Sequence, residues 1–409
     1  MLGRFWSGCI ITAFLACLGQ LILLDQHQIF DQAIQALFDV ATLSVEIALG
    51  LIGLMAIWLG FFKIAEHAGL MAMIARRLNP LFVKLMPELP NNHPAISSMT
   101  MNLSANALGL DNAATPFGIK AMQDLQSVNR HPQQLSNAQI LFLVLNTSSV
   151  TVLPISVFLF RAQQGATHPT EVFIPILIAT FTSTLVGLLS VAWVQKLPLF
   201  NRTVIGYLAL FSAIPIGLAA YFMSLPQEQV SQQAALFANF ILFSIVVVFI
   251  CIGLIKKVAV YDAFIEGAKE GFGIAIKLIP YLIAMLLAIA LLRVSGLLDA
   301  LLVGLSFFLN LLHIDTAFVE AMPTAIMKPF SGSGARAAMI EVMQEQGVDS
   351  FPAKVSAVMQ GSTETTFYVL AVYCGAVGIS KIRYALSCSL LADFTGICAA
   401  IILSYVFFA

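Results

Sequence analysis

Two short polar runs interrupt stretches of this sequence that are otherwise apolar enough to cross a membrane. They are residues 146–151 (NTSSVT) and residues 360–366 (QGSTETT). In hydrocarbon, a broken helix leaves backbone N–H and C=O groups unpaired at a cost of several kcal/mol each, so breaks persist only where they line a cavity inside the protein. Matching breaks in two halves of a chain are typical of secondary transporters, which bind their solute near the middle of the membrane.

The composition agrees with a membrane protein and excludes several classes of function. Hydrophobic residues make up 59% of the 409 residues and charged residues 10%, whereas a soluble domain carries about 25% charge. The net charge of −1 provides no basic surface for nucleic acid. The six cysteines are scattered through apolar segments without metal-ligand spacing. We therefore expect a lipid bilayer and a small-molecule solute as partners, no nucleic acid and no metal site, with a homo-oligomer as an open alternative.

Apolar segments near the length that a helix needs to span the bilayer predict an all-α polytopic membrane protein. The expected spans are residues 5–24, 44–64, 136–161, 171–195, 203–223, 233–255, 278–294, 353–378 and 384–408. Two further stretches are too polar and too rich in Gly and Pro for ordinary spans, and we expect re-entrant helical hairpins there, at residues 95–125 and 316–345. Helices lying along the membrane interface are expected at residues 28–42, 66–88, 258–273 and 297–313.

Lysine and arginine are enriched in the loops on one side of these spans, and cytoplasmic loops carry such an excess. Outside the hairpins, only Arg161, Arg293 and Lys354 fall on the opposite side. We therefore expect a multi-pass protein of the bacterial inner membrane with its N-terminus cytoplasmic and its C-terminus external. The first span also fits a cleaved signal peptide, but no A-x-A-like site follows it, which favours a retained anchor helix.

The order of these elements predicts two inverted repeats, each with one re-entrant helical hairpin and one broken transmembrane helix. In this topology the first span of repeat one runs inward and the first span of repeat two runs outward. Residues 66–70 (EHAGL) follow the former as residues 293–297 (RVSGL) follow the latter. The expected domains are an N-terminal anchor helix at 1–25, repeat one at 26–197, connecting transmembrane helices at 198–256 and repeat two at 257–409.

Three motifs carry a resemblance to a known family. Residues 102–118 (NLSANALGLDNAATPFG) resemble the signature of spore maturation protein A, and residues 329–336 (PFSGSGAR) and 360–368 (QGSTETTFY) resemble spore maturation protein B. The chain looks like a fusion of the two over nearly its whole length. Both belong to the nucleoside-recognition, or gate, superfamily, which also includes the membrane parts of concentrative nucleoside transporters and of ferrous-iron transporter B. The resemblance implies a transporter-like core; the sequence contains no GTPase P-loop of the iron-transporter kind.

We expect the solute or a coupling ion to bind polar side chains in the two breaks and the two hairpins. Half-helix N-termini offer N–H donors to anions, unwound carbonyls offer oxygen to cations, and asparagine can both donate and accept, which suits a neutral polar or zwitterionic solute. Single Ser and Thr residues in spans often bond carbonyls of their own helix instead, but clustering at two equivalent breaks favours binding. The candidates are Asn102, Ser104, Asn106, Asn112, Asn146, Thr147, Ser148, Ser149, Thr151, Ser331, Ser333, Gln360, Ser362, Thr363, Glu364 and Thr365.

Glu364 is the candidate for ion coupling or for recognition of a substrate charge. Glu364 and Asp393 are the deepest acids in the expected spans, and ionisable groups at such depth are costly and usually functional. A carboxyl group there must be protonated, paired with Na⁺ or a substrate ammonium, or bonded to a basic hairpin residue such as Arg336. The last alternative would make Glu364 part of a structural ion pair.

These features predict a secondary-active inner-membrane transporter of a small polar solute that works by alternating access. The solute would be nucleoside-like, amino-acid-like or another small metabolite, with Na⁺ or H⁺ as coupling ion and no other cofactor. The alternative is a non-transporting structural or partner membrane protein in envelope or spore-type maturation. We expect no enzymatic activity, because no nucleophile–base pair is evident in the sequence.

Overall fold

The chain folds as an all-α membrane protein in the computed structural model, which describes residues 2–90, 93–107, 111–148 and 151–409. Seven of the described helices are long and apolar enough to cross a membrane. They are α1 (Leu2–Leu23), α2 (Ile29–His67), α8 (Phe173–Gln195), α9 (Arg202–Met223), α10 (Gln227–Ile255), α11 (Val260–Val294) and α17 (Ala385–Phe408). The chain is therefore a multi-pass membrane protein, as its composition indicates.

The two remaining expected spans are each divided into two short helices at the polar runs. The first comprises α6 (Asn137–Ser148) and α7 (Ile155–Gln163), and the second comprises α15 (Phe351–Ser362) and α16 (Thr366–Ala376). In the second break, Thr363 and Thr365 have extended backbones, with φ of −146° and −85°. We call residues 151–154 and 363–365 the first and second break; residues 149 and 150, which precede the first, lie outside the described part of the chain.

The two expected hairpins each contain a pair of packed helices. The first pair is α4 (Pro94–Ala107) and α5 (Asp111–Ser127); the second is α13 (Met322–Met327), which follows the 3₁₀ turn η1 (Val319–Ala321), and α14 (Gly332–Gln346). The side chain of Ser331 caps α14, since its Oγ accepts a hydrogen bond from the backbone N–H of Gly334 at 3.0 Å. This cap begins the helix next to the second break.

The interfacial helices expected at 28–42 and 258–273 do not exist as separate elements. They continue without interruption into the following spans, as the N-terminal parts of α2 and α11. In α2 the polar residues at the expected boundary fit inside the helix: the Thr42 and Ser44 hydroxyls donate to the carbonyls of Phe38 and Val40, one turn back, at 3.2 and 2.7 Å. α11 runs along α2 and passes through Pro280 without ending.

The other two interfacial helices are present as α3 (Leu70–Leu85) and α12 (Leu297–Leu311). Each begins directly after a glycine with positive φ, Gly69 at 75° and Gly296 at 66°, which ends the preceding long helix. A side chain at either position would strain this left-handed backbone. The same turn therefore follows α2 and α11, within the corresponding sequence motifs at residues 66–70 and 293–297.

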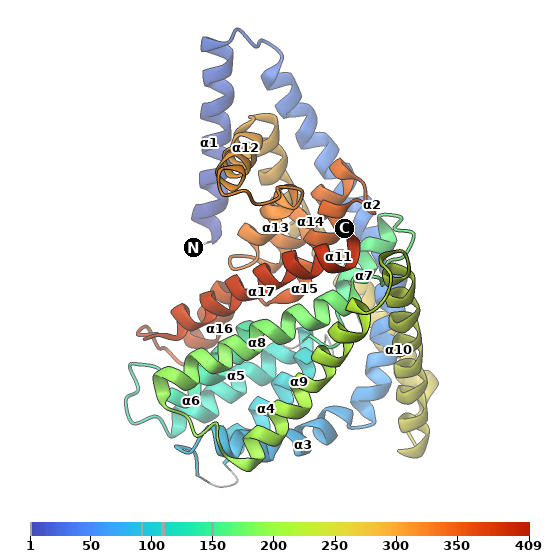
Figure 1. Ribbon diagram of the computed structural model, residues 1–409, viewed down its shortest axis with the longest axis vertical. Coiled ribbons are helices and arrows are strands. Elements are labelled where there is room, and N and C mark those ends of the chain that lie inside the picture. Colours follow the sequence, from blue (N-terminus) through green and yellow to red (C-terminus); the bar gives the residue numbers. More distant parts are fainter. Residues whose placement is uncertain (1, 91–92, 108–110, 149–150) are drawn as a thin grey trace.

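The two halves of the chain are directed toward opposite ends of the molecule. Figure 1 shows α3, α4 and α5 in the lower part, and α12, α13 and α14 in the upper part. α8 and α17 run side by side between these groups and pack against α6 and α15. The broken spans are thereby held at the centre of the fold.

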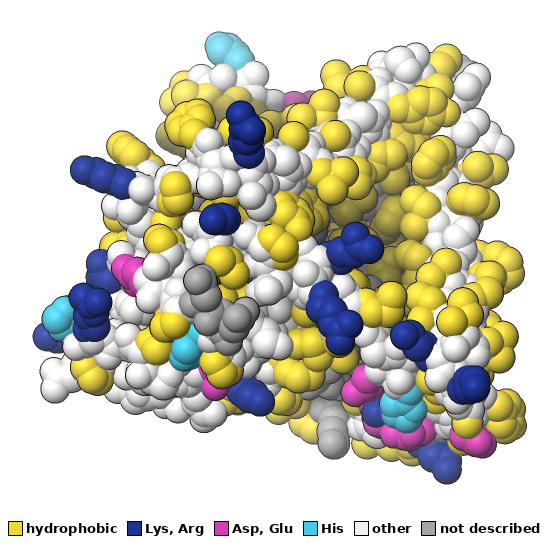
Figure 2. Space-filling view, turned by 90° about the horizontal axis from the view of Figure 1, so that it is seen from below, with side chains coloured by type: hydrophobic (Ala, Val, Ile, Leu, Met, Phe, Trp, Pro, Cys, Tyr) yellow, Lys and Arg dark blue, Asp and Glu magenta, His cyan; other side chains and the backbone are white. Residues whose placement is uncertain are grey.

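Basic side chains gather at the end of the molecule where α3 lies. Figure 2 views this end and shows Lys and Arg side chains spread over it. Arg76, Arg77 and Lys84 of α3 are exposed. Arg130 and Lys381 are also exposed, in two connections that are joined by an isolated bridge between Gln134 and Lys381. These residues belong to the group that the sequence placed on one side of the membrane.

Candidate functional site

The second break contacts the C-terminal end of α6 through a backbone hydrogen bond. The N–H of Glu364, in the second break, donates to the carbonyl oxygen of Thr147, at the end of α6, at 2.8 Å. The Thr147 hydroxyl in turn donates to Ser389 Oγ on α17 at 2.9 Å. The ends of two half-helices from opposite halves of the chain therefore meet beside α17.

Each broken span is also bonded to the hairpin of its own half. In the first half the N–H of Val152 donates to the carbonyl of Ala107 at 3.0 Å, and in the second half the N–H of Phe367 donates to the carbonyl of Pro329 at 2.9 Å. Backbone groups that the interruption of a helix would leave unpaired are thus bonded to the hairpins. In the first half the acceptor is the last residue of α4 and the donor lies within the break, whereas in the second half the acceptor follows α13 and the donor lies in the first turn of α16.

A cavity of about 500 Å³ lies where the breaks and hairpins meet, a size typical of small-molecule sites. Nine of the sequence candidates line it: Asn106, Asn146, Thr151, Ser331, Ser333, Gln360, Thr363, Glu364 and Thr365. Both halves of the chain therefore contribute to one polar cavity.

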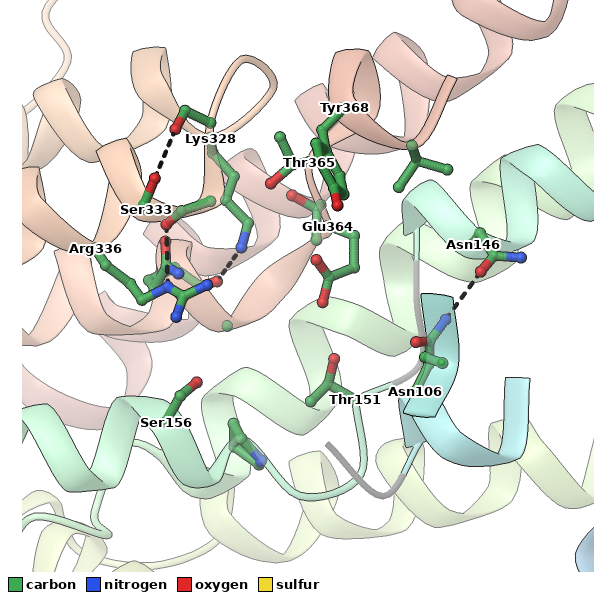
Figure 3. Close-up of a pocket in the computed structure, with 18 of the residues that line it drawn as sticks. Asn106, Asn146, Thr151, Ser156, Lys328, Ser333, Arg336, Glu364, Thr365 and Tyr368 are labelled. Atoms are coloured by element: carbon green, nitrogen blue, oxygen red, sulfur yellow. Dashed lines mark hydrogen bonds between the residues drawn. The ribbon is translucent and has the colours of Figure 1, made fainter. Parts of the chain in front are cut away.

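Charged side chains divide this cavity into distinct regions. Figure 3 shows Lys328 and Arg336 on one side, Asn106 and Asn146 on the other, and Glu364 between them. Lys328 is 3% exposed and its ammonium donates to the carbonyl of Gln360 at 2.6 Å. The Arg336 Nε donates to the carbonyl of Gly332 at 3.2 Å. Because Gly332 and Ser333, in the first turn of α14, also line the cavity, the two cations and a helix N-terminus face the same space.

Asparagine side chains order the opposite side of the cavity. Asn106 of α4 donates through Nδ2 to Asn146 Oδ1 of α6 at 2.9 Å, and Asn146 Nδ2 donates to the Phe142 carbonyl at 3.0 Å. Asn102 lies behind the lining: its Nδ2 donates to the Ala114 carbonyl at 2.7 Å and to the Tyr373 hydroxyl at 3.2 Å. Asn102 therefore holds Tyr373, which does line the cavity.

Several sequence candidates do not line this cavity. Ser104, Ser148 and Ser362 donate to carbonyls of their own helices, at 2.6, 2.8 and 2.8 Å, and Thr147 bonds to α17 as described above. Ser149 lies outside the described residues, as does the side chain of Asn112. Ser104, Ser148 and Ser362 thus have bonding partners within the protein that a serine in any membrane helix can find.

Further lining residues were absent from the sequence candidates. They are Thr115, Ser156, Tyr281, Lys328, Phe330, Arg336, Tyr368 and Tyr373, among others. For Lys328 and Arg336 a signal existed, because charged residues flanking the polar tip of a hairpin within the membrane are usually functional. The tyrosines gave no comparable signal, since an aromatic residue in an apolar helix is ordinarily part of the packing.

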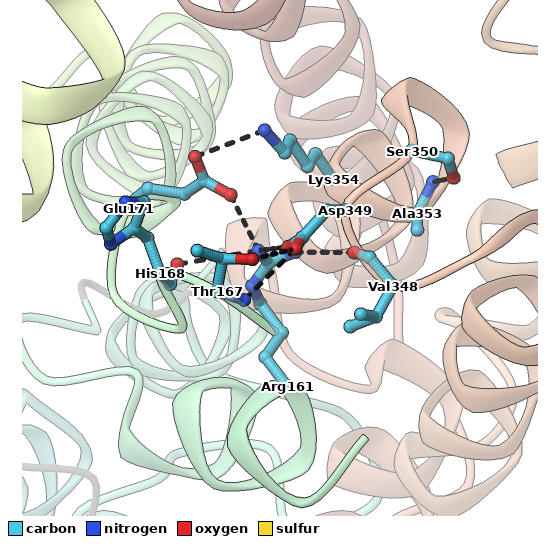
Figure 4. Close-up of polar contacts among 9 residues, drawn as sticks. All are labelled: Arg161, Thr167, His168, Glu171, Val348, Asp349, Ser350, Ala353 and Lys354. Atoms are coloured by element: carbon cyan, nitrogen blue, oxygen red, sulfur yellow. Dashed lines mark hydrogen bonds and ion pairs between the residues drawn. The ribbon is translucent and has the colours of Figure 1, made fainter. Parts of the chain in front are cut away.

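A second polar cluster joins the two halves at another place (Figure 4). Arg161 of α7 is fully buried; its Nη2 lies 2.7 Å from Glu171 Oε1 and 3.3 Å from Asp349 Oδ1. Lys354 of α15 lies 3.1 Å from the other Glu171 oxygen. Thr167 donates to Asp349 Oδ2 from its N–H at 3.0 Å and from its hydroxyl at 2.7 Å. We call these five residues the loop cluster, because they bind the α7–α8 connection to the α14–α15 connection.

The charge of Asp349 is stabilised by this cluster. Partial burial alone would raise the pKa of its carboxyl group, but the two hydrogen bonds from Thr167 and the positive charges of Arg161 and Lys354 hold that pKa below its ordinary value. Arg293, the remaining basic residue on this side in the sequence analysis, pairs with Glu341. All three basic residues expected on the external side therefore have acidic partners.

Comparison with known families agrees with the resemblance seen in the motifs. The family model described as "Gate: Nucleoside recognition" matches two stretches, residues 48–164 and 275–380, which together make up more than half of the chain. Both stretches include a hairpin and a break. A membrane protein of the nucleoside-transporter type is the class that this match and the apolar helices together indicate.

Two curated proteins of Bacillus subtilis (strain 168) are similar to this chain. Spore maturation protein B is 46% identical over 151 residues, which are 37% of this chain and 83% of the relative. Spore maturation protein A is 39% identical over 149 residues, which are 36% of this chain and 76% of the relative. Even placed end to end, these matches leave about a quarter of the chain uncovered, so the similarity is less extensive than the near-complete coverage expected from the motifs.

Proposed function

We propose, from the premise that this chain belongs to the nucleoside-recognition (Gate) family, that it is a secondary-active transporter of the bacterial inner membrane. It moves a small polar solute by alternating access, and its N-terminus is cytoplasmic and its C-terminus external. The observation that carries the proposal is the polar cavity at the meeting point of the two breaks, lined by both halves of the chain. Irregular backbone at membrane depth is costly unless it serves such a cavity.

The solute carries an anionic group and also polar or basic groups. Lys328, Arg336 and the N-terminal turn of α14 face one side of the cavity, which favours a carboxylate or a similar anion. Glu364 and the Asn106–Asn146 pair face the remainder and suit an ammonium, an amide or a hydroxyl. An amino-acid-like or dipeptide-like zwitterion fits this distribution of charge better than a neutral nucleoside does.

Inverted repeats provide the mechanism of this proposal. The equivalent glycine turns before α3 and α12, the hydrogen bond between each hairpin and the broken span of its own half, and the opposite placement of α3 and α12 support such repeats. Repeats of opposite orientation around a fixed site allow the cavity to open to either side by rocking of one repeat against the other. The second break and the end of α6, which bond to each other, would stay near the centre of that motion.

The test begins with purified full-length protein and a thermal-shift screen against nucleosides, amino acids, dipeptides, dicarboxylates and metal ions. We expect stabilisation by a zwitterionic or anionic solute, followed by gradient-dependent uptake of that solute in proteoliposomes. The names of the two relatives favour a second candidate, a non-transporting partner protein in spore-type maturation. Absence of both stabilisation and uptake across the panel would favour that second candidate.

A further inference from the structure

A group of buried oxygen atoms without hydrogen-bond partners lies behind the cavity, between the second break and α17. Both carboxyl oxygens of Asp393 and the hydroxyls of Thr363 and Thr366 form no hydrogen bond of ordinary geometry among the described residues. None of these three side chains is more than 2% exposed. Leaving buried polar atoms unbonded costs about 1–3 kcal/mol each, and more for a charged group, so a cluster of them indicates a missing ligand.

These side chains belong to one place in the fold. The Thr366 and Thr363 hydroxyls lie close enough to the Asp393 carboxyl to act on it as donors, although neither contact has the geometry of an ordinary hydrogen bond. Thr363 follows the last residue of α15, and Thr366 begins α16. Gly396, one turn after Asp393, allows α17 to approach this closely, because a Cβ there would lie 2.6 Å from Thr363 Cγ2. The close contact brings the carboxyl group of Asp393 to the broken end of the half-helix.

The surroundings favour a cation. All four atoms are oxygens, and the C-terminal end of α15 carries the negative end of the helix dipole. One cation already lies at this end of α15, since the Lys328 ammonium donates to the Gln360 carbonyl. The Lys328 ammonium forms no hydrogen bond with Asp393. Glu364 is the other charged group near Asp393. The Asp393 carboxyl therefore lies near one positive and one negative side chain.

The small number of acidic side chains at this position favours a monovalent cation over a divalent one. The described residues contain no group of three or more His, Cys, Asp or Glu side chains that could hold a metal, whereas divalent cations are usually held by several carboxylates. A proton would satisfy one carboxyl oxygen only. A small alkali cation can be coordinated by the carboxylate and both hydroxyls at once.

We propose that Asp393, Thr363 and Thr366 form a binding site for Na⁺ at the C-terminal end of α15, separate from the solute cavity. Thr363 contributes to both places, because it also lines the cavity. Occupancy by Na⁺ would fix the second break in the conformation that faces the solute. As a coupling site it rests on the proposed transport function; as an ion site it does not.

The test measures ion binding directly and requires no transport. Full-length protein in detergent, at constant pH and ionic strength, is titrated with NaCl in place of choline chloride, and the thermal unfolding midpoint is recorded. We expect a saturable rise with NaCl that KCl does not reproduce. Asp393→Asn should retain its fold in choline but weaken the apparent Na⁺ affinity about 10- to 100-fold. Thr363→Val and Thr366→Val should each weaken it about two- to tenfold.

Matched controls keep the outcome specific. Asp39→Asn changes an exposed acid of α2, and Thr395→Val changes a hydroxyl of α17 that bonds its own helix at Leu391; neither should alter the Na⁺ response. If Asp393→Asn fails to fold, the two threonine variants carry the test. A wild-type protein without a Na⁺-specific response, or a response that survives in Asp393→Asn, would overturn the site. Saturable Na⁺ binding without uptake of any solute would support the Na⁺ site and would contradict the transport proposal instead.

Discussion

At the scale of single residues, the difference between the hairpin cations is informative. Arg336 of the second hairpin lines the cavity, whereas Lys120 of the first hairpin is exposed and does not line it. The two hairpins therefore contribute different charges to the cavity. The charge that faces the solute comes mainly from the second half of the chain, where Lys328 and Glu364 also lie.

Arg336→Gln should weaken binding of an anionic or zwitterionic solute about 10- to 100-fold, because a charge-assisted hydrogen bond contributes about 1.5–3 kcal/mol. The measurement is solute-dependent thermal stabilisation, or isothermal titration once the solute is identified. Lys120→Gln provides the matched control and should leave affinity unchanged. Equal loss in both variants would mean that Arg336 acts only through the general charge of the protein.

Glu364→Gln should selectively weaken solutes that carry an ammonium group, by a similar factor, while solutes without one retain their affinity. The reason is that Glu364 is the acidic side chain lining the cavity. Competition assays with a paired amine and its uncharged analogue separate the two effects. Misfolding of this variant that is rescued by adding Arg336→Gln would instead identify a structural ion pair, and unchanged, fully coupled transport would exclude a role for Glu364.

At the scale of elements, the loop cluster joins parts of the chain that are far apart in sequence. Glu171 lies between Arg161 and Lys354 and has one oxygen directed at each. Such a buried arrangement is costly to disrupt, because the removal of one partner leaves another charge buried and uncompensated. The cluster therefore restrains the α7–α8 connection against the α14–α15 connection.

Asp349→Asn should destabilise the protein by about 1 kcal/mol near neutral pH, a small value because the Asp349 side chain is partly exposed and screened. Its pKa in the folded protein lies below the ordinary value. The stabilisation is therefore present above the unfolded pKa of about 4 and is lost as the pH falls through the folded pKa.

Thermal unfolding midpoints of wild type and Asp349→Asn, measured from about pH 7 to about pH 3, test this expectation. The difference between the two proteins should shrink below about pH 4. Asp39→Asn, at an exposed position of α2, serves as the control. A difference that does not change with pH would show that the Asp349 charge is not involved.

Both breaks lie at the predicted polar runs, since residues 360–366 enclose the second break and residues 146–151 overlap the first. A polar interruption in an apolar span has few other structural explanations. Helix ends without such a marker were missed. Residues 28–42 and 44–64 form one helix because Thr42 and Ser44 bond within it, and a change from polar to apolar composition does not end a helix. For the site, the sequence identified the polar segments but not the helix faces: Ser362 bonds its own helix while its neighbour Thr363 lines the cavity.

At the scale of the whole molecule, orientation in the membrane follows from the distribution of charge. The end that contains α3 carries exposed basic side chains, and basic loops are retained in the cytoplasm. On the opposite side Arg161, Lys354 and Arg293 are each paired with an acid. The pairing lowers the positive charge exposed on the side that we propose to be external.

Labelling of single introduced cysteines with a membrane-impermeant reagent tests this topology in intact cells. Residues 226–231 should react from outside, whereas residues 76–84 and 256–257 should react only after the membrane is opened. Native cysteines are first replaced by alanine or serine. Accessibility of residues 76–84 and 297–313 from the same side would contradict the inverted repeats, because α3 and α12 would then not face opposite compartments.

The hydrogen bond from Glu364 to Thr147 has a consequence for how the protein is made. The cavity needs both halves of the chain, and the second half is translated only after the connecting helices α9 and α10. When only the first half has been translated, the chain therefore contains half of a binding site. The N–H of Glu364, which donates to the carbonyl of Thr147 in the complete protein, has not yet been synthesised. In a single polypeptide the two halves are synthesised in equal number and never separate. Halves encoded as two proteins would need matched expression and mutual recognition before either could hold a solute.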